Sequence, residues 1–172
     1  MFCNSCAFSF GKCSAALLVT MALLMPAGPG HSAELQAWLR RSGVDRAVTP
    51  QVAAAAERGD AKAQARLGFM YATGRDVPQN YALAAYWYRR GAEQGNAAAQ
   101  HLLGLSYDKG FGVPNDLVLA HMWLNLAAAH TRGDAHEDNV RLRDAVAGKL
   151  SLGQLADAQQ LAAVWVPKPE RR

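Results

Sequence analysis

Cysteine is scarce in this chain of 172 residues, and its few cysteines gather at one end. Cys3, Cys6 and Cys13 all precede residue 14, so residues 14–172 contain no cysteine. That long segment therefore cannot form a disulfide framework, use a thiol nucleophile or bind a metal through thiolates. Whatever fold it adopts must be stable without covalent cross-links.

Charge is almost absent from the first 33 residues, where Lys12 is the only charged side chain before Glu34. An apolar run, AALLVTMALLM, covers residues 15–25, and the helix-breaking segment PAGPG follows it at residues 26–30. A short positive region, a short apolar stretch and small residues after it are typical of a secretory signal peptide. The apolar run is too short to span a bilayer comfortably, and an uncleaved membrane anchor is the alternative.

We therefore expect residues 1–33 to be a leader that sends the chain to the periplasm or out of the cell. Ala33 is a candidate last residue of the leader, but His31 fits poorly at the third position before that cut. The position of cleavage stays open. Apart from this segment, we expect no contact with a membrane.

The sequence also lacks the basic stripe with interleaved aromatic residues that nucleic-acid-binding proteins carry. The net charge is only +4, and basic residues alternate with acidic ones, as Arg58 does with Asp60 and Lys109 with Asp108. We therefore expect no nucleic-acid partner.

Signatures of catalysis are missing as well. There is no G-x-S-x-G elbow, no H-E-x-x-H pair and no glycine loop of the kind that binds phosphates. His130 and His136 flank several acidic residues, but their spacing matches no standard metal-ligand pattern. We expect no catalytic residue, no cofactor and no metal.

What the chain does contain is a repeat. Residues 59–94 align with residues 95–130 without a gap, and 14 of the 36 positions are identical. A period of this length with many alanines indicates a helical solenoid, in which stacked helical pairs share a core. No segment is a strong candidate for a strand.

Each copy is predicted to form a helix, a turn and a second helix. Gly74 and Gly110 are expected to end the first helices in the left-handed conformation, and the Val-Pro that follows each glycine prevents the helix from resuming. The second helices are expected to end at Gly95 and near residues 132–133. The predicted N-caps of the four helices are Asp60, Asn80, Asn96 and Asp116.

Two kinds of repeated residue indicate how the helices pack. Gly68 and Gly104 lie inside the first helices, where glycine costs about 1 kcal/mol relative to alanine, so we expect a neighbouring helix to approach closely there. Trp87 and Trp123 lie on the second helices and are predicted to fill the core. An aromatic ligand cage is the alternative for these tryptophans.

The repeated pattern A-x-A-Q-x-x-L-G-x-x-Y-x-x-G, followed by V-P and then A-x-x-W, resembles the Sel-1-like repeat, a subclass of the tetratricopeptide-like solenoids. The resemblance covers residues 59 to about 133, with looser agreement as far as Trp165. It implies an all-α, right-handed α-α superhelix. Asp76 departs from the family, which prefers glycine there as at Gly112, and the first corner is expected to be strained or slightly different in shape.

The flanks of the repeats are predicted to be capping helices that seal the array. Residues 34–58 are assigned to an N-terminal cap, with one helix near residues 33–43 and another starting at Thr49-Pro50. Residues 59–94 and 95–133 are the two repeats, and residues 134–166 form a C-terminal cap with helices near 135–149 and 152–165. Capping boxes are expected at Asp134 with Glu137 and at Ser151 with Gln154. Residues 167–172 are expected to be a frayed tail.

The resemblance implies a concave groove lined by the first helix of each pair, at positions that the repeat leaves free to vary. Phe69 and Leu105 are the candidate apolar anchors for a protein or peptide partner, with polar residues beside them for selectivity. Contact with a flanking helix, or simple surface exposure, is the alternative for these residues. The candidate groove residues are Lys62, Phe69, Thr73, His101, Leu105, Asp108 and Lys109.

These observations favour a non-catalytic adaptor or scaffold of the bacterial envelope that binds a protein or peptide. A hydrolase of cell-wall or β-lactam chemistry is an alternative, because some Sel-1-like members have been connected with β-lactams. Those members place a disulfide in each repeat, which residues 14–172 of this chain cannot do. A structural oligomerisation module is the third hypothesis.

Overall fold

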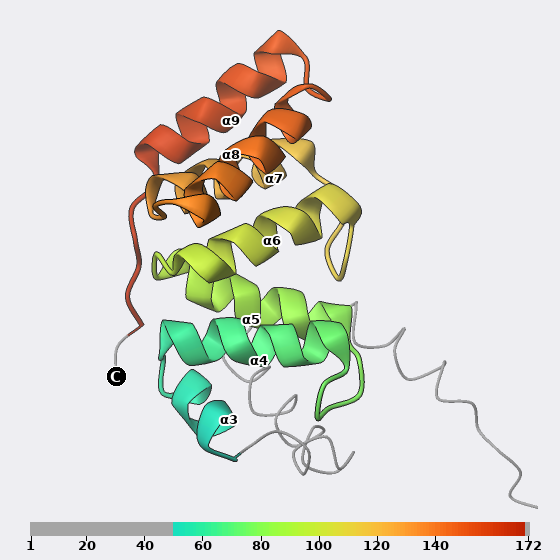
Figure 1. The fold of residues 1–172 in the computed structure, drawn as a ribbon, viewed down its shortest axis with the longest axis vertical. Coiled ribbons are helices and arrows are strands. Elements are labelled where there is room, and N and C mark those ends of the chain that lie inside the picture. The colour runs from blue at the N-terminus through green and yellow to red at the C-terminus, as the bar shows by residue number, and fades with distance from the viewer. Residues whose placement is uncertain (1–49, 171–172) are drawn as a thin grey trace, which may run out of the picture. The chain divides into compact units, whose positions relative to one another are not determined.

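Helices provide all the regular secondary structure in residues 50–170, the part of the chain that the structure, a computed structural model, describes. These residues belong to one contact unit, Leu39–Arg172. The predicted leader and the predicted helix near residues 33–43 lie outside them. No helix among the described residues has both the length and the apolarity to cross a membrane. The helices are α3 (Pro50–Glu57), α4 (Ala61–Thr73), α5 (Tyr81–Glu93), α6 (Ala97–Lys109), α7 (Leu117–Ala129), α8 (Asp134–Ala147) and α9 (Leu152–Val164) (Figure 1).

Local capping starts the repeat helices where the sequence predicts. The Asp60 carboxylate accepts hydrogen bonds from the backbone N–H groups of Lys62 at 2.9 Å and Ala63 at 3.1 Å. The same role is filled, each toward the N–H group three residues on, by Asn80, Asn96 and Asp116. These contacts satisfy helix N–H groups that have no partner within the helix, so the predicted N-caps are confirmed.

The corners between paired helices also follow the prediction. Gly74 and Gly110 end α4 and α6 with φ of 70° and 72°, in the left-handed region. Asp76 adopts the same region, with φ of 64°, where the second copy has Gly112 at 74°. Only glycine fits at residue 112, because a Cβ atom there would lie 2.0 Å from the carbonyl oxygen of Tyr81. The two corners thus differ in residue type but share a backbone conformation.

Within each repeat the two helices pack through the predicted glycine. A Cβ atom at Gly68 would lie 2.5 Å from Cδ1 of Tyr88, and one at Gly104 would lie 2.8 Å from Cγ of Leu124. Contacts between α4 and α5 and between α6 and α7 are extensive, and α5 packs on α6 to join the repeats. Trp87 and Trp123 are both 7% exposed and belong to the core, as predicted. The residues described form an all-α solenoid, which confirms the predicted fold class.

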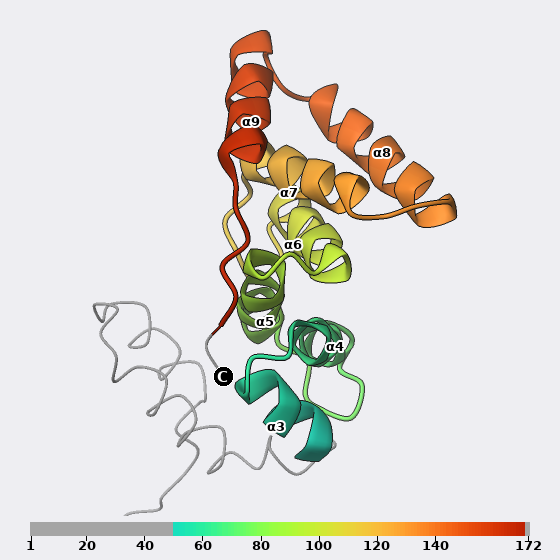
Figure 2. The same cartoon turned by 90° about the vertical axis from the view of Figure 1, so that its left-hand side faces the viewer.

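The third helical pair is arranged differently from the first two. Both α8 and α9 contact α7, but they diverge from each other (Figure 2). The predicted capping box at Asp134 and Glu137 is wrong, because Gly133 stands at the N-cap with φ of 59° and no side chain caps α8. Asp134 and Glu137 instead lie in the first turn, where negative charge favours the helix dipole. The predicted capping box of Ser151 and Gln154 at the start of α9 is confirmed.

The segment after α9 packs against the helices up to residue 170. The predicted frayed tail is therefore wrong for residues 167–170. Trp165 packs edge-on against Trp123, with ring centroids 6.0 Å apart. The backbone N–H group of Lys168 donates a hydrogen bond to the carbonyl oxygen of Glu93 at 2.7 Å. Glu170 pairs with Arg90. The contacting residues are far apart in the chain, and no local pattern predicts such a contact.

Candidate functional site

The predicted groove residues lie on two helices that pack against each other. Lys62, Phe69 and Thr73 belong to α4, and the other four belong to α6. Phe69 is 44% exposed, which is high for a large aromatic side chain in a helix whose opposite side is buried. Lys62, Thr73 and Lys109 are also exposed, whereas His101, Leu105 and Asp108 are partly buried. All three predicted residues on α4 are therefore exposed, whereas three of the four on α6 are partly buried.

His101 is engaged within the fold. Its Nδ1 atom lies 2.6 Å from Oδ1 of Asn139, a buried residue of α8. The Asn139 amide in turn donates to the Thr131 hydroxyl at 3.1 Å. This chain of hydrogen bonds ties α8 to α6, so His101 has a structural role that the sequence did not reveal.

Asp108 is engaged as well. Its two carboxylate oxygens pair with the ammonium groups of Lys149, at 2.5 Å, and Lys109, at 2.9 Å, and its side chain is only 7% exposed. Burial alone would raise the pKa of Asp108, but the hydrogen bonds and charges of Lys149 and Lys109 lower it below its ordinary value. The carboxylate therefore serves as a junction between α6 and the end of α8.

We call three of the predicted groove residues the α4–α6 face: Lys62, Phe69 and Leu105. The Thr73 hydroxyl is used locally, because it donates to the Phe69 carbonyl at 2.8 Å. The face offers one aromatic anchor, one aliphatic neighbour at the equivalent repeat position and one positive charge. Such a composition suits capture of a segment with an apolar and an acidic side chain.

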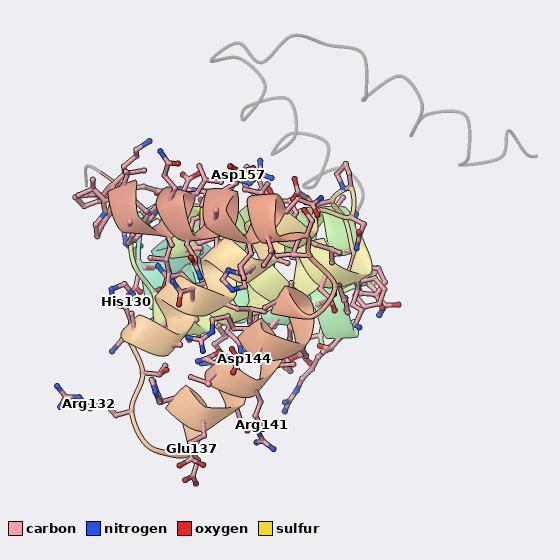
Figure 3. All side chains as sticks on the ribbon, turned by 90° about the horizontal axis from the view of Figure 1, so that it is seen from above. His130, Arg132, Glu137, Arg141, Asp144 and Asp157 are labelled. Atoms are coloured by element: carbon pink, nitrogen blue, oxygen red, sulfur yellow. The ribbon has the colours of Figure 1, made fainter. Side chains whose placement is uncertain are left out.

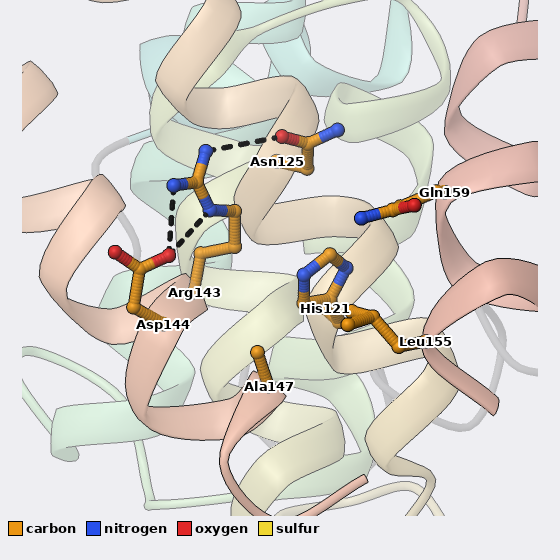
Figure 4. Close-up of a pocket in the computed structure, with 7 residues that line it drawn as sticks. All are labelled: His121, Asn125, Arg143, Asp144, Ala147, Leu155 and Gln159. Atoms are coloured by element: carbon orange, nitrogen blue, oxygen red, sulfur yellow. Dashed lines mark hydrogen bonds and ion pairs between the residues drawn. The ribbon is translucent and has the colours of Figure 1, made fainter. Parts of the chain in front are cut away.

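A polar pocket lies where the third pair diverges. It has a volume of about 470 Å³, and α7, α8 and α9 each contribute to its wall (Figure 4). The lining residues are His121, Asn125, Arg143, Asp144, Ala147, Leu155 and Gln159.

Arg143 dominates the charge of this pocket, but its charge is compensated. Its Nε and Nη2 atoms donate to one Asp144 oxygen at 2.9 and 2.7 Å, and Nη1 is 3.4 Å from the Asn125 amide oxygen (Figure 4). No serine, threonine or cysteine lines the pocket, so it offers no hydroxyl or thiol nucleophile. The groups present can hydrogen-bond a small polar molecule.

His121 is the most buried polar group of the pocket. Only 3% of the residue is exposed, and its Nδ1 atom has no hydrogen-bond partner in the part of the chain described. Burial lowers the pKa of His121, and Arg143 lowers it further, while Asp144 opposes the change. The imidazole is therefore held neutral. A signal existed in the sequence, because His121 and Asn125 are four residues apart in an otherwise apolar helix, but the pocket was not predicted.

Two further histidines, His130 and His136, make contacts within the fold. No group of three or more potential metal ligands occurs within residues 50–170. His130 contacts the Gln100 amide oxygen at 3.0 Å, and His136 contacts the Ala128 carbonyl at 2.9 Å. Glu137 and Arg141 project outward from α8 (Figure 3).

Comparison with known proteins agrees with the repeat geometry. The family model described as Sel1 repeat matches residues 61–96 and 97–131. The chain is similar to the crystal structure of a protective antigen of uropathogenic Escherichia coli strains that displays an SLR fold, with 31% identity and a TM-score of 0.66. The alignment covers 83% of this chain and 31% of the antigen chain, so this protein spans about a third of the antigen.

A second similar structure is a Sel1 repeat protein from Oxalobacter formigenes. It is 45% identical over 54% of this chain and 68% of that chain, with a TM-score of 0.49. No curated protein matches the chain. Two matched repeats, with their caps, glycine contacts and buried tryptophans in place, show that the chain belongs to the Sel1 repeat family.

Proposed function

We propose that this protein is a non-catalytic adaptor of the bacterial envelope that binds a protein or peptide on its α4–α6 face. Sel1 repeats typically serve protein–protein interaction. The observation that carries the proposal is the exposure of Phe69, at 44%, on a helix whose other large apolar side chains are buried. An exposed aromatic residue on a rigid helix loses little freedom on binding and makes an effective anchor.

The neighbours of Phe69 support recognition of a mixed apolar and acidic segment. Leu105 occupies the equivalent position in the second repeat, and α4 contacts α6 directly. Lys62 is exposed one to two turns earlier on α4 and supplies a positive charge. Asp108 and His101 position α8 beside the face through Lys149 and Asn139, and we assign them to support of the site.

Export of the chain is part of the same proposal. The charge-poor, apolar segment at residues 15–25 is typical of a leader. Fractionation of cells that produce the tagged protein tests this point, and recovery in the cytoplasmic fraction alone would contradict it.

Photo-crosslinking tests the proposed face directly. A photoreactive phenylalanine analogue at residue 69 of the full chain, activated in intact cells, should give a discrete crosslinked product. The matched control carries the analogue at Leu161, which is also exposed but lies on α9. Mass spectrometry then identifies the partner. Equal products from both positions, or none from residue 69, would contradict the proposed face.

A further inference from the structure

Residues 165–170 run back along the array in the direction opposite to the stacking of the helices, past the loops that join one helical pair to the next (Figures 1 and 2). At the start of this segment Trp165 meets Trp123, and its ring centroid lies 6.2 Å from that of His130. At its end Glu170 reaches the first repeat. Contact between residues this far apart is unusual in a solenoid, where each repeat contacts mainly its neighbours.

The middle of the segment is held by one backbone hydrogen bond and by the packing of a proline against a glycine. Lys168 donates its backbone N–H group to the Glu93 carbonyl at 2.7 Å, at the end of α5. Pro167 lies over Gly95, where an added Cβ atom would be 3.7 Å from the proline ring. The side chains of residues 166–169 are otherwise exposed. A foreign peptide could supply the same backbone group and the same proline.

The Glu170 carboxylate fits a specific set of donors. Arg90 donates from Nε to one carboxylate oxygen at 2.8 Å and from Nη2 to the other at 2.5 Å. The Gln64 amide donates to the second oxygen at 3.1 Å. A forked guanidinium contact of this kind is both strong and geometrically selective for a carboxylate.

Both donors also make contacts that do not involve the tail. The Arg90 guanidinium lies 4.8 Å from the Trp87 ring centroid and 5.8 Å from that of Tyr86. The fully buried Gln64 donates to the Ala56 carbonyl at 3.0 Å and accepts from Gln94 at 2.7 Å. We call this surface the edge strip; it consists of Gln64, Arg90, Trp123, His130 and the carbonyl group of Glu93.

The tail contacts the edge strip through few interactions, and these are of the kind that binds peptides in other contexts. Two prolines, Pro167 and Pro169, restrict the segment to extended conformations, so little entropy is lost when it docks. Because the tail is tethered, it competes at an effective concentration of about 1 mM. A partner segment with the same features can therefore compete when its own affinity is in a comparable range.

We propose that the edge strip is a binding site for an extended, proline-containing segment with an acidic side chain, and that residues 165–170 occupy the strip until such a segment displaces them. The strip uses residues outside the α4–α6 face. Its test is therefore independent of the proposed function above.

A labelled peptide tests the proposal on the full chain. The probe is the acetylated, amidated and fluorescein-labelled segment WVPKPE, followed by fluorescence anisotropy. Glu170→Lys should release the tail and bind the probe about threefold to tenfold more tightly than the unmodified protein does. Arg90→Glu added to that variant should weaken binding at least about tenfold, because it removes the guanidinium group that donates hydrogen bonds to the carboxylate of the probe.

Controls separate the strip from charge effects. Arg66→Glu makes the same charge change at an exposed position on α4 and should leave probe binding unchanged, as should Phe69→Ser with Leu105→Ser. A probe that ends in glutamine should bind more weakly. If Glu170→Lys proves poorly folded by circular dichroism, Glu170→Gln should show the same order of affinities with a smaller gain.

Three results would overturn the proposal: no binding to the tail-released variant at millimolar probe, equal binding by the unmodified protein, or no effect of Arg90→Glu. Light scattering tests whether the strip is instead occupied by the tail of a second copy of the chain. A dimer that Glu170→Lys dissociates would assign the strip to the tail of a second copy and would also overturn the proposal.

Discussion

Gly68 lies so close to Tyr88 that a Cβ atom at residue 68 would be 2.5 Å from the tyrosine Cδ1 atom and 3.0 Å from the Ala84 carbonyl oxygen. Tyr88 is 3% exposed and cannot swing into solvent. Its burial also raises the pKa of its hydroxyl above the range in which tyrosine normally ionises. The first repeat thus depends on the absence of a side chain at one position.

Gly68→Ala should therefore destabilise the protein, although alanine is intrinsically the better helix former. The overpacking penalty of about 1–3 kcal/mol outweighs the gain of about 1 kcal/mol in helix propensity. Gly153→Ala is the matched control, because nothing lies within 4 Å of a Cβ atom there. Urea unfolding should show a lower midpoint for the first variant and an unchanged or higher one for the second. A stable Gly68→Ala protein would contradict the close approach of α4 and α5.

Trp123 connects the second repeat to the C-terminal part of the fold, because it packs in the core and against Trp165. Trp123→Ala should reduce the free energy of unfolding by about 3–5 kcal/mol. Leu161→Ala, at an exposed position on α9, should change it by less than about 0.5 kcal/mol. Thermal unfolding followed by circular dichroism compares the two. Similar melting temperatures would show that residue 123 is not a core position.

Loss of the Asp108 junction should lower the free energy of unfolding by less than loss of Trp123 does. Asp108→Asn removes the charge that Lys149 and Lys109 contact and should destabilise the protein by about 1–2 kcal/mol. Because its pKa is lowered in the folded protein, the contribution of Asp108 is present above its ordinary pKa and is lost as the pH falls through the lowered value. Asp157→Asn, on the outer side of α9, is the control and should be neutral (Figure 3). Equal effects of the two changes would argue against the junction.

His121 predicts a pH dependence at higher pH. Its pKa is lowered by burial from an ordinary value of 6.5, so below about pH 6.5 the unfolded chain gains a proton that the folded protein does not. The free energy of unfolding should therefore fall as the pH drops from 6.5, until the folded pKa is reached. His121→Gln should remove this part of the slope, which urea titrations at about pH 7.5 and about pH 5 would measure. An unchanged slope would contradict the buried neutral state.

Much of the fold could be predicted because its determinants are local. Asp60 and its equivalents form hydrogen bonds to N–H groups within three residues, and Gly74 sets a single backbone conformation. Such signals involve residues that are close together in the sequence, and each signal occurs in both repeats. The capping box predicted at Asp134 shows the limit of such local signals. An acidic residue suits the first turn of a helix as well as its N-cap, and in the structure Gly133 is the N-cap.

The candidate site was predicted less completely because its contacts are long-range. Asp108 meets Lys149 and His101 meets Asn139, pairs that are 41 and 38 residues apart. Glu170 meets Gln64, which is 106 residues away. No spacing in a single sequence reveals such pairs, so two of the candidate groove residues turned out to support the fold, and the docked tail was missed.

The central claim is that the repeats present a binding face whose anchors are dispensable for folding. The most direct measurement compares Phe69→Ser with Leu105→Ser, made together, against the unmodified protein, recording both thermal unfolding and binding to the partner that residue 69 crosslinks. We predict that partner binding is lost while the melting temperature stays nearly unchanged. Undiminished binding, or a collapse of the melting temperature that shows these residues to be core, would contradict the claim.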